Sequence, residues 1–486
     1  MTMTHQLNLF TAEFPELSSE GVVVDKRGGL LPQESSAAPK DGGKEMRSSS
    51  AVMNNVIALL PKAFDKVASN NGAPGPDRQD IEQVRKHLAH VLRELGAALR
   101  DGSYRPGMTR RVWIPKADGG QRALGIPNVV DRIVQTAVSM VLEPKCEQRF
   151  HPNSHGFRPG RSCHSAILQA RDYVEQGSDW VVDIDLEKFF DTVNHQRLMA
   201  RLAEIESDPE LLKLVGLMLK ARTVMPDGLV VANDTGVPQG GPLSALLSNI
   251  VLNELDWKLE ERGHKFVRYA DDCKIYVRSE RAGQRVMAST SQWITKTLRL
   301  KVNAGKSAVA RPRERHFVGF SLETNDADEV EIRLSERSLK RLRAKVVELT
   351  PRNWGDKLDS CIERLNSYLI GWLGFFSIVG QGELRTLRTI DAHIRRRLRA
   401  IMFKHWKRKQ TMARRLTKMG ARHKTAWDTV YAGSSRIWWL SGSSVANSTI
   451  KNAYFVGKGL VMLAERWNAK HSKITASGQV LLPGIV

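Results

Sequence analysis

The chain has 486 residues, of which 41% are hydrophobic and 26% charged, so it holds enough apolar material for a large core. Its 74 Lys and Arg residues outnumber the 52 Asp and Glu residues by 22, and this excess makes nucleic acid the leading class of partner. No apolar run approaches the roughly 18 residues of a membrane-spanning helix, and the first residues lack a secretory signal, so we expect no membrane partner. The four cysteines are scattered without paired spacing, which is typical of a reduced cytoplasmic protein.

Four regions follow one another along the chain. Residues 1–50 are rich in Ser, Gly, Glu, Lys and Pro, which predicts a mobile arm, with a docked peptide as the alternative. Residues 51–325 alternate short β-branched runs with amphipathic helical patterns, which indicates an α+β fold. Residues 335–420 are predicted to be helical, and residues 425–486 form a small basic C-terminal segment.

Two apolar stripes predict the first helices of the helical region. Ser335 is expected to cap the first helix and Pro351 to end it. Apolar residues recur between them at steps of three and four, and the same steps recur between Leu358 and Phe376. Both stripes are expected to pack against each other or against the preceding domain, and not against a cofactor.

A short acidic strand is predicted at residues 180–186. Because side chains alternate along a strand, Asp183 and Asp185 fall on one face, roughly 6.6 Å apart. Val182 and Ile184 fall on the opposite face. An aspartate at such a place can simply cap a turn, so this cluster alone does not indicate a site.

A second acidic cluster lies within residues 266–277, which predict a hairpin with Asp271 and Asp272 at its turn. Adjacent carboxylates repel each other unless a cation lies among them. Hard cations such as Mg²⁺ prefer oxygen ligands, and two of them about 3.5–4 Å apart can activate a primer hydroxyl and stabilise a leaving pyrophosphate. Two acidic clusters in so basic a chain favour a site for two Mg²⁺ ions, with Mn²⁺ as a substitute.

A strongly basic segment lies in the helical region. Residues 381–425 contain 15 Lys and Arg but only two acids, Glu383 and Asp391. Cations interleaved with aromatic residues suit phosphate neutralisation and base stacking, whereas a solvated helix face normally carries charges of both signs. The predicted RNA-binding residues are Arg395, Arg396, Arg397, Arg399, Lys404, Trp406, Lys407 and Arg408.

The order of the motifs resembles that of a known enzyme family. Tyr269, Ala270, Asp271 and Asp272 resemble the metal-binding hairpin of reverse transcriptases, and the stretch around Asp185 resembles the other half of their palm site. Further segments match in order. Residues 114–127 resemble the fingers segment of these enzymes, residues 155–162 the motif of the bacterial type, and residues 236–244 the loop before the hairpin. The closing palm motifs are resembled by residues 303–307 and 317–320. The thumb of group II intron maturases is similar to residues 365–372 and 395–409. Their C-terminal segment is similar to residues 435–441 and 452–455.

The resemblance implies a right-hand polymerase with fingers and palm at residues 51–325, a helical thumb at 335–420 and a DNA-binding-like segment at 425–486. Asp185 and Asp271 would bridge the metals, Asp272 would support them, and the carbonyl of Leu186 would be a further ligand. The residues expected to bind the incoming deoxynucleotide are Lys116, Arg122, Phe190 and Gln239.

The same resemblance implies that Arg158, Tyr269 and Ala270 contact the primer or template. Some of these roles have simpler alternatives. Arg158 could instead pair with an acid inside the fingers, and Phe190 could be part of the palm core. Lys116 and Arg122 could be ordinary surface charges.

The expected function is RNA-templated DNA synthesis by a bacterial group II intron protein that also binds its parent intron RNA and assists splicing. Its partners would be intron RNA, target DNA, an RNA template with a DNA primer, and dNTPs. It would lie in the cytoplasm, and on the nucleoid when bound to DNA. Nothing after Cys361 offers zinc-ligand spacing, so no C-terminal endonuclease is expected. The alternatives are an RNA-dependent RNA polymerase, the reverse transcriptase of another bacterial retroelement, and a maturase that is only an RNA chaperone.

Overall fold

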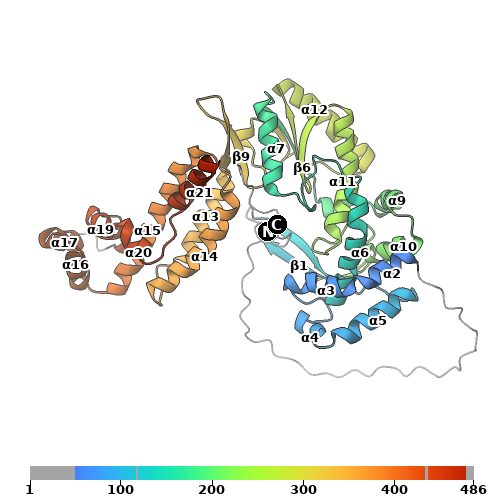
Figure 1. Ribbon diagram of the computed structural model, residues 1–486, viewed down its shortest axis with the longest axis horizontal. Coiled ribbons are helices and arrows are strands. Elements are labelled where there is room, and N and C mark those ends of the chain that lie inside the picture. The colour runs from blue at the N-terminus through green and yellow to red at the C-terminus, as the bar shows by residue number, and fades with distance from the viewer. Residues whose placement is uncertain (1–49, 116–118, 433–435, 478–486) are drawn as a thin grey trace, which may run out of the picture. The chain divides into compact units, whose positions relative to one another are not determined.

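The computed structural model describes residues 50–115, 119–432 and 436–477, with side chains as far as residue 472. The predicted arm, except for Ser50, lies outside the described residues, and so does Lys116. The chain forms two compact units, each of which contains helices and strands (Figure 1), and this confirms the α+β fold class. The first unit contains the described residues up to His151, then Glu187–Leu255 and Thr295–Lys301; the second contains Pro152–Leu186, Asp256–Ile294 and the chain from Val302.

The first unit combines helices with a small sheet. Its strand order is β2 (Gln121–Ile126), β1 (Thr109–Pro115), β4 (Thr223–Val224), β5 (Val230–Val231); β1 pairs antiparallel with β2 and parallel with β4. Its helices are α2 (Ala51–Ala58), α3 (Leu60–Ser69), α4 (Ile81–Lys86), α5 (Leu88–Arg100), α6 (Val129–Glu147), α8 (Phe189–Thr192), α9 (His195–Ile205) and α10 (Pro209–Leu219). Helix α6 is the centre of the core, and α2 and α3 pack against it.

The second unit is built around an antiparallel sheet. Its strand order is β6 (Lys265–Tyr269), β7 (Asp272–Val277), β3 (Trp180–Ile184), β8 (Ala308–Ala310). Helices α7 (Cys163–Glu175) and α12 (Glu280–Trp293) pack on this sheet. Two elements continue from one unit into the other: α11 (Ser244–Glu261) and the π-helix η1 (Ile294–Leu298).

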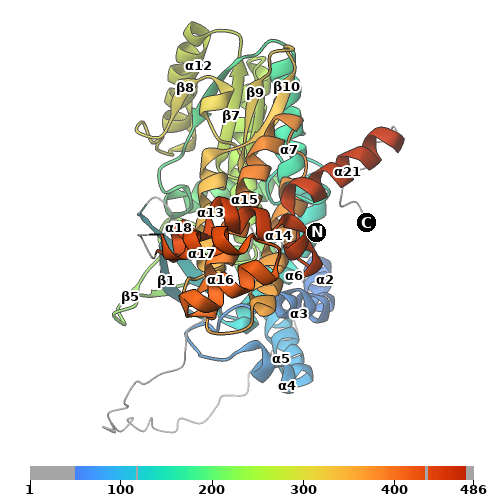
Figure 2. The same ribbon diagram turned by 90° about the vertical axis from the view of Figure 1, so that its left-hand side faces the viewer.

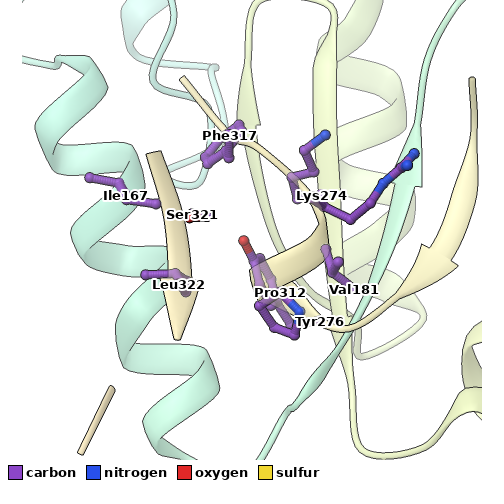
Figure 3. Close-up of a pocket in the computed structure, with 9 residues that line it drawn as sticks. Ile167, Val181, Lys274, Tyr276, Pro312, Phe317, Ser321 and Leu322 are labelled. Carbon is purple, nitrogen blue, oxygen red and sulfur yellow. The ribbon is translucent and has the colours of Figure 1, made fainter. Parts of the chain in front are cut away.

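The two faces of this sheet meet different helices. A Cβ on Gly283 of α12 would lie 2.5 Å from the Val309 Cγ1 and 3.5 Å from the Val182 Cγ2, so α12 packs closely on that face. On the other face, Lys274 and Ile167 of α7 line a small pocket (Figure 3). Val182 and Lys274 therefore lie on opposite faces, as alternation along paired strands requires.

The remainder of the second unit begins with β9 (Phe320–Thr324) and β10 (Val330–Leu334) and becomes helical. Ser335 caps α13 (Glu336–Leu349) by accepting a hydrogen bond from the Ser338 N–H, and the helix ends before Pro351, as predicted. The later helices, several of them labelled in Figure 2, are α14 (Leu358–Phe376), α15 (Leu384–Trp406), α16 (Lys409–Lys418), α17 (His423–Tyr431), α18 (Ile437–Ser441), α19 (Ser444–Thr449), α20 (Asn452–Gly457) and α21 (Leu463–Ser477). Short 3₁₀ turns lie at Pro312–Glu314 and Gln381–Glu383.

The predicted apolar stripes form the core of these helices. Leu342 and Val346 of α13 and Leu365 and Leu369 of α14 are fully buried. The helices α13 and α14 pack against each other and against α15, so the stripes line helix–helix contacts as expected. Among the described residues, no helix is both long enough and apolar enough to cross a membrane.

Candidate active site

Asp185, the first predicted metal ligand, directly follows strand β3. Its N–H donates to the Ser307 Oγ (3.0 Å) and its carbonyl accepts from the Asn303 N–H (2.8 Å), so its backbone is held at two points. Leu186 faces Val302 in an antiparallel bridge. The hydrogen bonds on either side of this bridge are made by the residues before and after Leu186 and Val302. The Leu186 carbonyl oxygen takes part in neither of them, so it is available to a ligand.

The hairpin of β6 and β7 carries the second predicted acidic cluster at its turn. Tyr269 pairs with Asp272, which leaves Ala270 and Asp271 as the two turn residues. Ala270 has a φ of +56°, in the left-handed region that costs an alanine about 1 kcal/mol or more. Such a conformation persists only where the surrounding structure enforces it.

The sheet brings the two acidic clusters together, because β7 lies between β6 and β3. Ile184 pairs with Cys273, so Asp185 comes next to Asp272. Burial raises the pKa of Asp185 above its usual range; Lys306 opposes this effect, and the carboxylates of Asp183 and Asp272 add to it. No described residue forms a hydrogen bond or ion pair with the Asp185 carboxylate, and a cation would stabilise a carboxylate in this environment.

Lys274 neutralises the other acids of this face. Its buried ammonium forms an ion pair with Asp183 and another with Asp272 at 2.8 Å. Burial alone would lower the pKa of Lys274, but the two carboxylates outweigh burial and raise it. Arg315 also pairs with Asp183 at 2.9 Å, so Asp183 is a structural acid and Asp272 is held in place.

The donor set fits Mg²⁺ in its chemistry, although no group of three or more acidic, histidine or cysteine side chains converges as a metal cluster within the described chain. Mg²⁺ is commonly bound by one or two protein carboxylates, with waters and substrate phosphates as its other ligands. Asp185, Asp271 at the turn and the Leu186 carbonyl would supply such a partial set.

The predicted nucleotide-binding residues of the first unit are connected by one loop, residues 236–241. At one end the Val237 N–H donates to the Phe190 carbonyl at 2.6 Å, and at the other the Gln239 carbonyl accepts from the Gly125 N–H at 2.8 Å. Gly125 lies on β2, three residues after Arg122. The loop therefore joins Phe190 and Gln239 to the strand that carries Arg122.

Two known families match consecutive parts of the chain. Residues 114–322 match the reverse transcriptase (RNA-dependent DNA polymerase) family, and residues 339–420 match the group II intron maturase-specific domain. The chain belongs to the group II intron reverse transcriptase/maturase family.

Individual relatives are similar over part of their length. Protein YkfC of Escherichia coli K12 is 45% identical over 209 residues, which are 42% of this chain and 55% of YkfC. The group II intron-encoded protein LtrA of Lactococcus lactis subsp. cremoris is 34% identical over 207 residues, which are 42% of this chain and 34% of LtrA. Among solved structures, a partial Cas6-RT-Cas1–Cas2 complex aligns with 51% of this chain and 43% of its own, at 25% identity and a TM-score of 0.33.

The maturase-specific region corrects part of the predicted RNA-binding surface. Arg397 donates to the Thr350 and Val347 carbonyls, where helix α13 ends, and Arg399 donates to the Ile450 carbonyl, where α19 ends. The two arginines are only 7% and 4% exposed, because they satisfy backbone oxygens that the helix ends leave without partners. They are structural residues, and their prediction as an RNA-binding surface is wrong.

The remaining residues of that prediction differ in exposure. Trp406 is buried and packs on Phe403, so it offers no stacking face to RNA. Arg395 and Arg396 are half-buried, and the guanidinium of Arg396 lies over the Trp438 ring at 4.2 Å. The exposed members are Lys404, Lys407 and Arg408.

The bacterial-type motif lies along the edge of the active-site hairpin. The His155 N–H donates to the Arg268 carbonyl, and the Arg268 N–H donates to the Asn153 carbonyl, so this segment adds to strand β6 in parallel. Arg158 is 6% exposed and donates to the Ser154 carbonyl. This contact lies inside the protein, so little of the Arg158 side chain is left exposed for the predicted template contact.

The primer contacts predicted for Tyr269 and Ala270 would involve little surface, because both residues are more than nine-tenths buried. The Tyr269 ring lies against Phe157, with the ring centroids 6.3 Å apart. Their role at the primer stays a prediction.

Two functional candidates, Lys274 and Arg268, were missed by the sequence analysis. The alternation that relates Asp183 to Asp185 also puts Lys274 on the face of Asp272, so the signal for Lys274 was present in the hairpin sequence. The sequence held no comparable signal for Arg268, because its side-chain partners Asp256 and Ser154 lie on other segments.

Replacing Gly156 by alanine should disturb the hairpin turn. A Cβ there would lie 2.3 Å from the Ala270 nitrogen, which is backbone and must shift. We expect a loss of about 1–3 kcal/mol in the free energy of unfolding, measured by urea denaturation. The matched control is Gly371→Ala on α14, where a Cβ meets nothing and stability should not fall; equal losses in both variants would contradict the prediction.

The same segment should make stability depend on pH through His155. Its ring nitrogens lie 2.8 Å from the Ser165 Oγ and 2.7 Å from the Gln169 Oε1, and burial lowers its pKa to about 4. Below pH 6.5 the unfolded chain binds a proton there that the folded chain does not, so stability should fall between pH 6.5 and about 4, by about 3 kcal/mol in total. In His155→Gln, the free energy of unfolding should depend less on pH across this range. The exposed His405→Gln should keep the pH dependence of the wild type.

Proposed function

We propose that this protein is an RNA-directed DNA polymerase that uses a two-metal mechanism. The observation that carries the proposal is the Asp185 carboxylate, which has no ion-pair partner in the described part of the chain and lies next to the acidic turn of the β6–β7 hairpin, among other acids. The fingers and palm would span residues 51–325, and the thumb residues 335–420.

Asp185 and Asp271 would hold two Mg²⁺ ions, which Mn²⁺ could replace, and the Leu186 carbonyl would be a further ligand. When bound, the ions supply charge for activating the primer 3′-hydroxyl and for stabilising the leaving pyrophosphate. Asp272 would fix the turn through its ion pair with Lys274. The Asp185 N–H donates to Ser307 and the Asp185 carbonyl accepts from Asn303, so the backbone that carries the carboxylate is already held in place before binding.

The nucleotide site would be formed in the first unit. Lys116 and Arg122 would bind the triphosphate, since cationic donors suit phosphate oxygens. Arg122 is partly exposed and has no ion-pair partner among the described residues, so it is available for this role. Phe190 would exclude a 2′-hydroxyl, and Gln239 would lie beside the nascent base pair.

The maturase role would be to bind the parent intron RNA and support its fold during splicing, and the polymerase would copy that RNA into target DNA. The exposed Lys404, Lys407 and Arg408 would contact phosphate, with smaller contributions from the half-buried Arg395 and Arg396. These partners would place the protein in the bacterial cytoplasm and on the nucleoid.

Primer extension on an RNA template tests the proposal, with dNTPs and NTPs supplied separately. The wild-type protein should incorporate dNTPs at least about a hundredfold more efficiently than NTPs, because a clash with Phe190 would reject the 2′-hydroxyl. Phe190→Val should reduce this preference at least about tenfold, and the conservative Phe190→Tyr should keep it. Equal use of both nucleotides by the wild type would support an RNA polymerase instead, and no extension with either would support a maturase that only chaperones RNA.

A further inference from the structure

Arg268 lies on β6 just before the acidic turn, and its side chain is almost completely buried. Its Nε and Nη2 donate to the two carboxylate oxygens of Asp256 at 2.7 and 2.5 Å. Its Nη1 donates to the Ala270 carbonyl at 2.7 Å, and Nη2 also donates to the Ser154 Oγ at 2.8 Å. One guanidinium thus connects α11, the hairpin turn and the segment beside β6.

The bond to Ala270 acts at the strained residue of the turn. Ala270 has a positive φ, and Gly156 lies so close to its nitrogen that no side chain fits between them. Arg268 therefore holds the carbonyl of Ala270 while Gly156 packs against its other side. The Ala270 carbonyl and the Asp271 nitrogen belong to one peptide plane, so holding this carbonyl restricts the orientation of Asp271 at the turn.

The two hydrogen bonds to the Asp256 carboxylate prevent the Arg268 guanidinium from turning away. A bidentate pair between arginine and carboxylate has a defined geometry, which a single ammonium does not reproduce. Both side chains are at most 1% exposed, so neither can exchange its partner for water. A buried ion pair is by itself weak evidence for stability, because an apolar pair of similar volume often does as well. That leaves the bond to the Ala270 carbonyl as the feature that an apolar pair could not replace.

We infer that Arg268 is a positioning residue for the metal site, held in place by Asp256: its hydrogen bond to the Ala270 carbonyl aims Asp271. The inference rests on the proposed function, since it takes Asp271 to be a metal ligand. A purely structural role for Arg268 is the competing account, and it predicts that restoring stability restores everything else.

The double variant Arg268→Met/Asp256→Leu separates the two accounts. It removes both charges together, so no unpaired ion remains in the core, but nothing donates to the Ala270 carbonyl. We expect its melting temperature to stay close to that of the wild type. Its affinity for Mn²⁺, measured by the electron paramagnetic resonance of free Mn²⁺, should fall at least about tenfold, as outer-sphere changes at metal sites typically do. Asp271→Asn gives the reference for a lost ligand.

The kinetic readout is primer extension by the same variants. The kcat of the double variant should fall at least about a hundredfold, and the KM for dNTP should stay within about threefold, because the nucleotide contacts are untouched. A stable double variant with wild-type Mn²⁺ affinity and wild-type kcat would overturn the inference.

Arg268→Lys covers the case in which the double variant does not fold. It keeps a positive charge next to Asp256, but one ammonium cannot reproduce the fork and also reach the Ala270 carbonyl. Mn²⁺ binding should weaken at least about fivefold in the folded variant, and unchanged binding would overturn the inference.

Failure of the proposed function gives a different pattern. A wild-type protein that binds Mn²⁺ without extending a primer would refute the polymerase, while the comparison of Mn²⁺ affinities would still decide the role of Arg268. A wild-type protein that does neither would overturn both proposals.

Discussion

Replacing Asp185 by asparagine should lower the rate of primer extension by at least about a thousandfold, which corresponds to roughly 4 kcal/mol of transition-state stabilisation. The amide keeps the shape of the side chain but loses the charge that would hold the metals. Burial and neighbouring acids already disfavour the ionised form of Asp185, as its raised pKa shows, so a neutral side chain is well tolerated there. Stability should therefore be unchanged or slightly increased.

The measurement is single-turnover extension of a DNA primer on an RNA template, with the melting temperature recorded for each variant. Asp179→Asn is the matched control, because Asp179 precedes β3 and its carboxylate forms an exposed ion pair with Arg311. A residual rate within about tenfold of the wild type would refute the role of Asp185.

The same assay separates the two activities when splicing is measured beside it. Asp185→Asn and Asp271→Ala should both abolish extension and leave intron RNA binding and splicing near normal, since the ribozyme would supply the splicing chemistry. If splicing fails as completely as extension does, the proposed division of labour is wrong.

Replacing Lys274 by methionine should destabilise the protein by about 3–5 kcal/mol, the usual cost of removing one partner from a buried ion pair. The methionine fills much of the same volume, so the loss is mainly electrostatic. Asp183 would keep only Arg315, and Asp272 would lose the ammonium that now pairs with it. Repulsion between Asp272 and Asp185 would then increase, because both carboxylates lie on one face of the sheet.

Urea denaturation monitored by circular dichroism gives the free energy of unfolding for this comparison. Lys265→Met on the adjacent strand is the matched control. Its ammonium donates to the exposed Gln176 side chain and lies 5.8 Å from the centre of the Tyr173 ring, so the same substitution should cost less than about 1 kcal/mol there. A change of less than about 1 kcal/mol for Lys274→Met would show that the ion pairs contribute little. Adding Mg²⁺ should recover part of the lost stability, since a cation at Asp185 would reduce the repulsion.

Much of the candidate site could be predicted because it depends on local periodicity. Alternation along a strand put Asp183 and Asp185 on one face, and the turn between two β-branched runs put Asp271 and Asp272 at the tip of a hairpin. The pairing of β3 with β7 could not be predicted from local periodicity, because the two strands are far apart in the sequence. The expectation that the two clusters form one site came from their charge in so basic a chain and from the resemblance to reverse transcriptases, not from any pattern that identifies strand partners.

The role of basic residues could not be predicted in the same way. A run of arginines on a helix looks the same whether its members face solvent or cap neighbouring helices. Arg397 and Arg399 are buried because the ends of α13 and α19 present carbonyl oxygens to them, and those helices are distant in sequence. Arg158 is buried for a similar reason, since it donates to a carbonyl of its own folded segment.

The sequence by itself determined the class of the fold, the acidic faces of two strands and the helical stripes, because each of these repeats with the period of a strand or a helix. Only the tertiary structure decided which charges are partners and which are surface. Lys274 neutralises Asp183 and Asp272, Arg268 grips Asp256 and the turn, and the Asp185 carboxylate is left without an ion-pair partner among the described residues. The physical reason is that the strength of a charge interaction depends on distance and burial, and both are set by segments that meet only when the chain has folded.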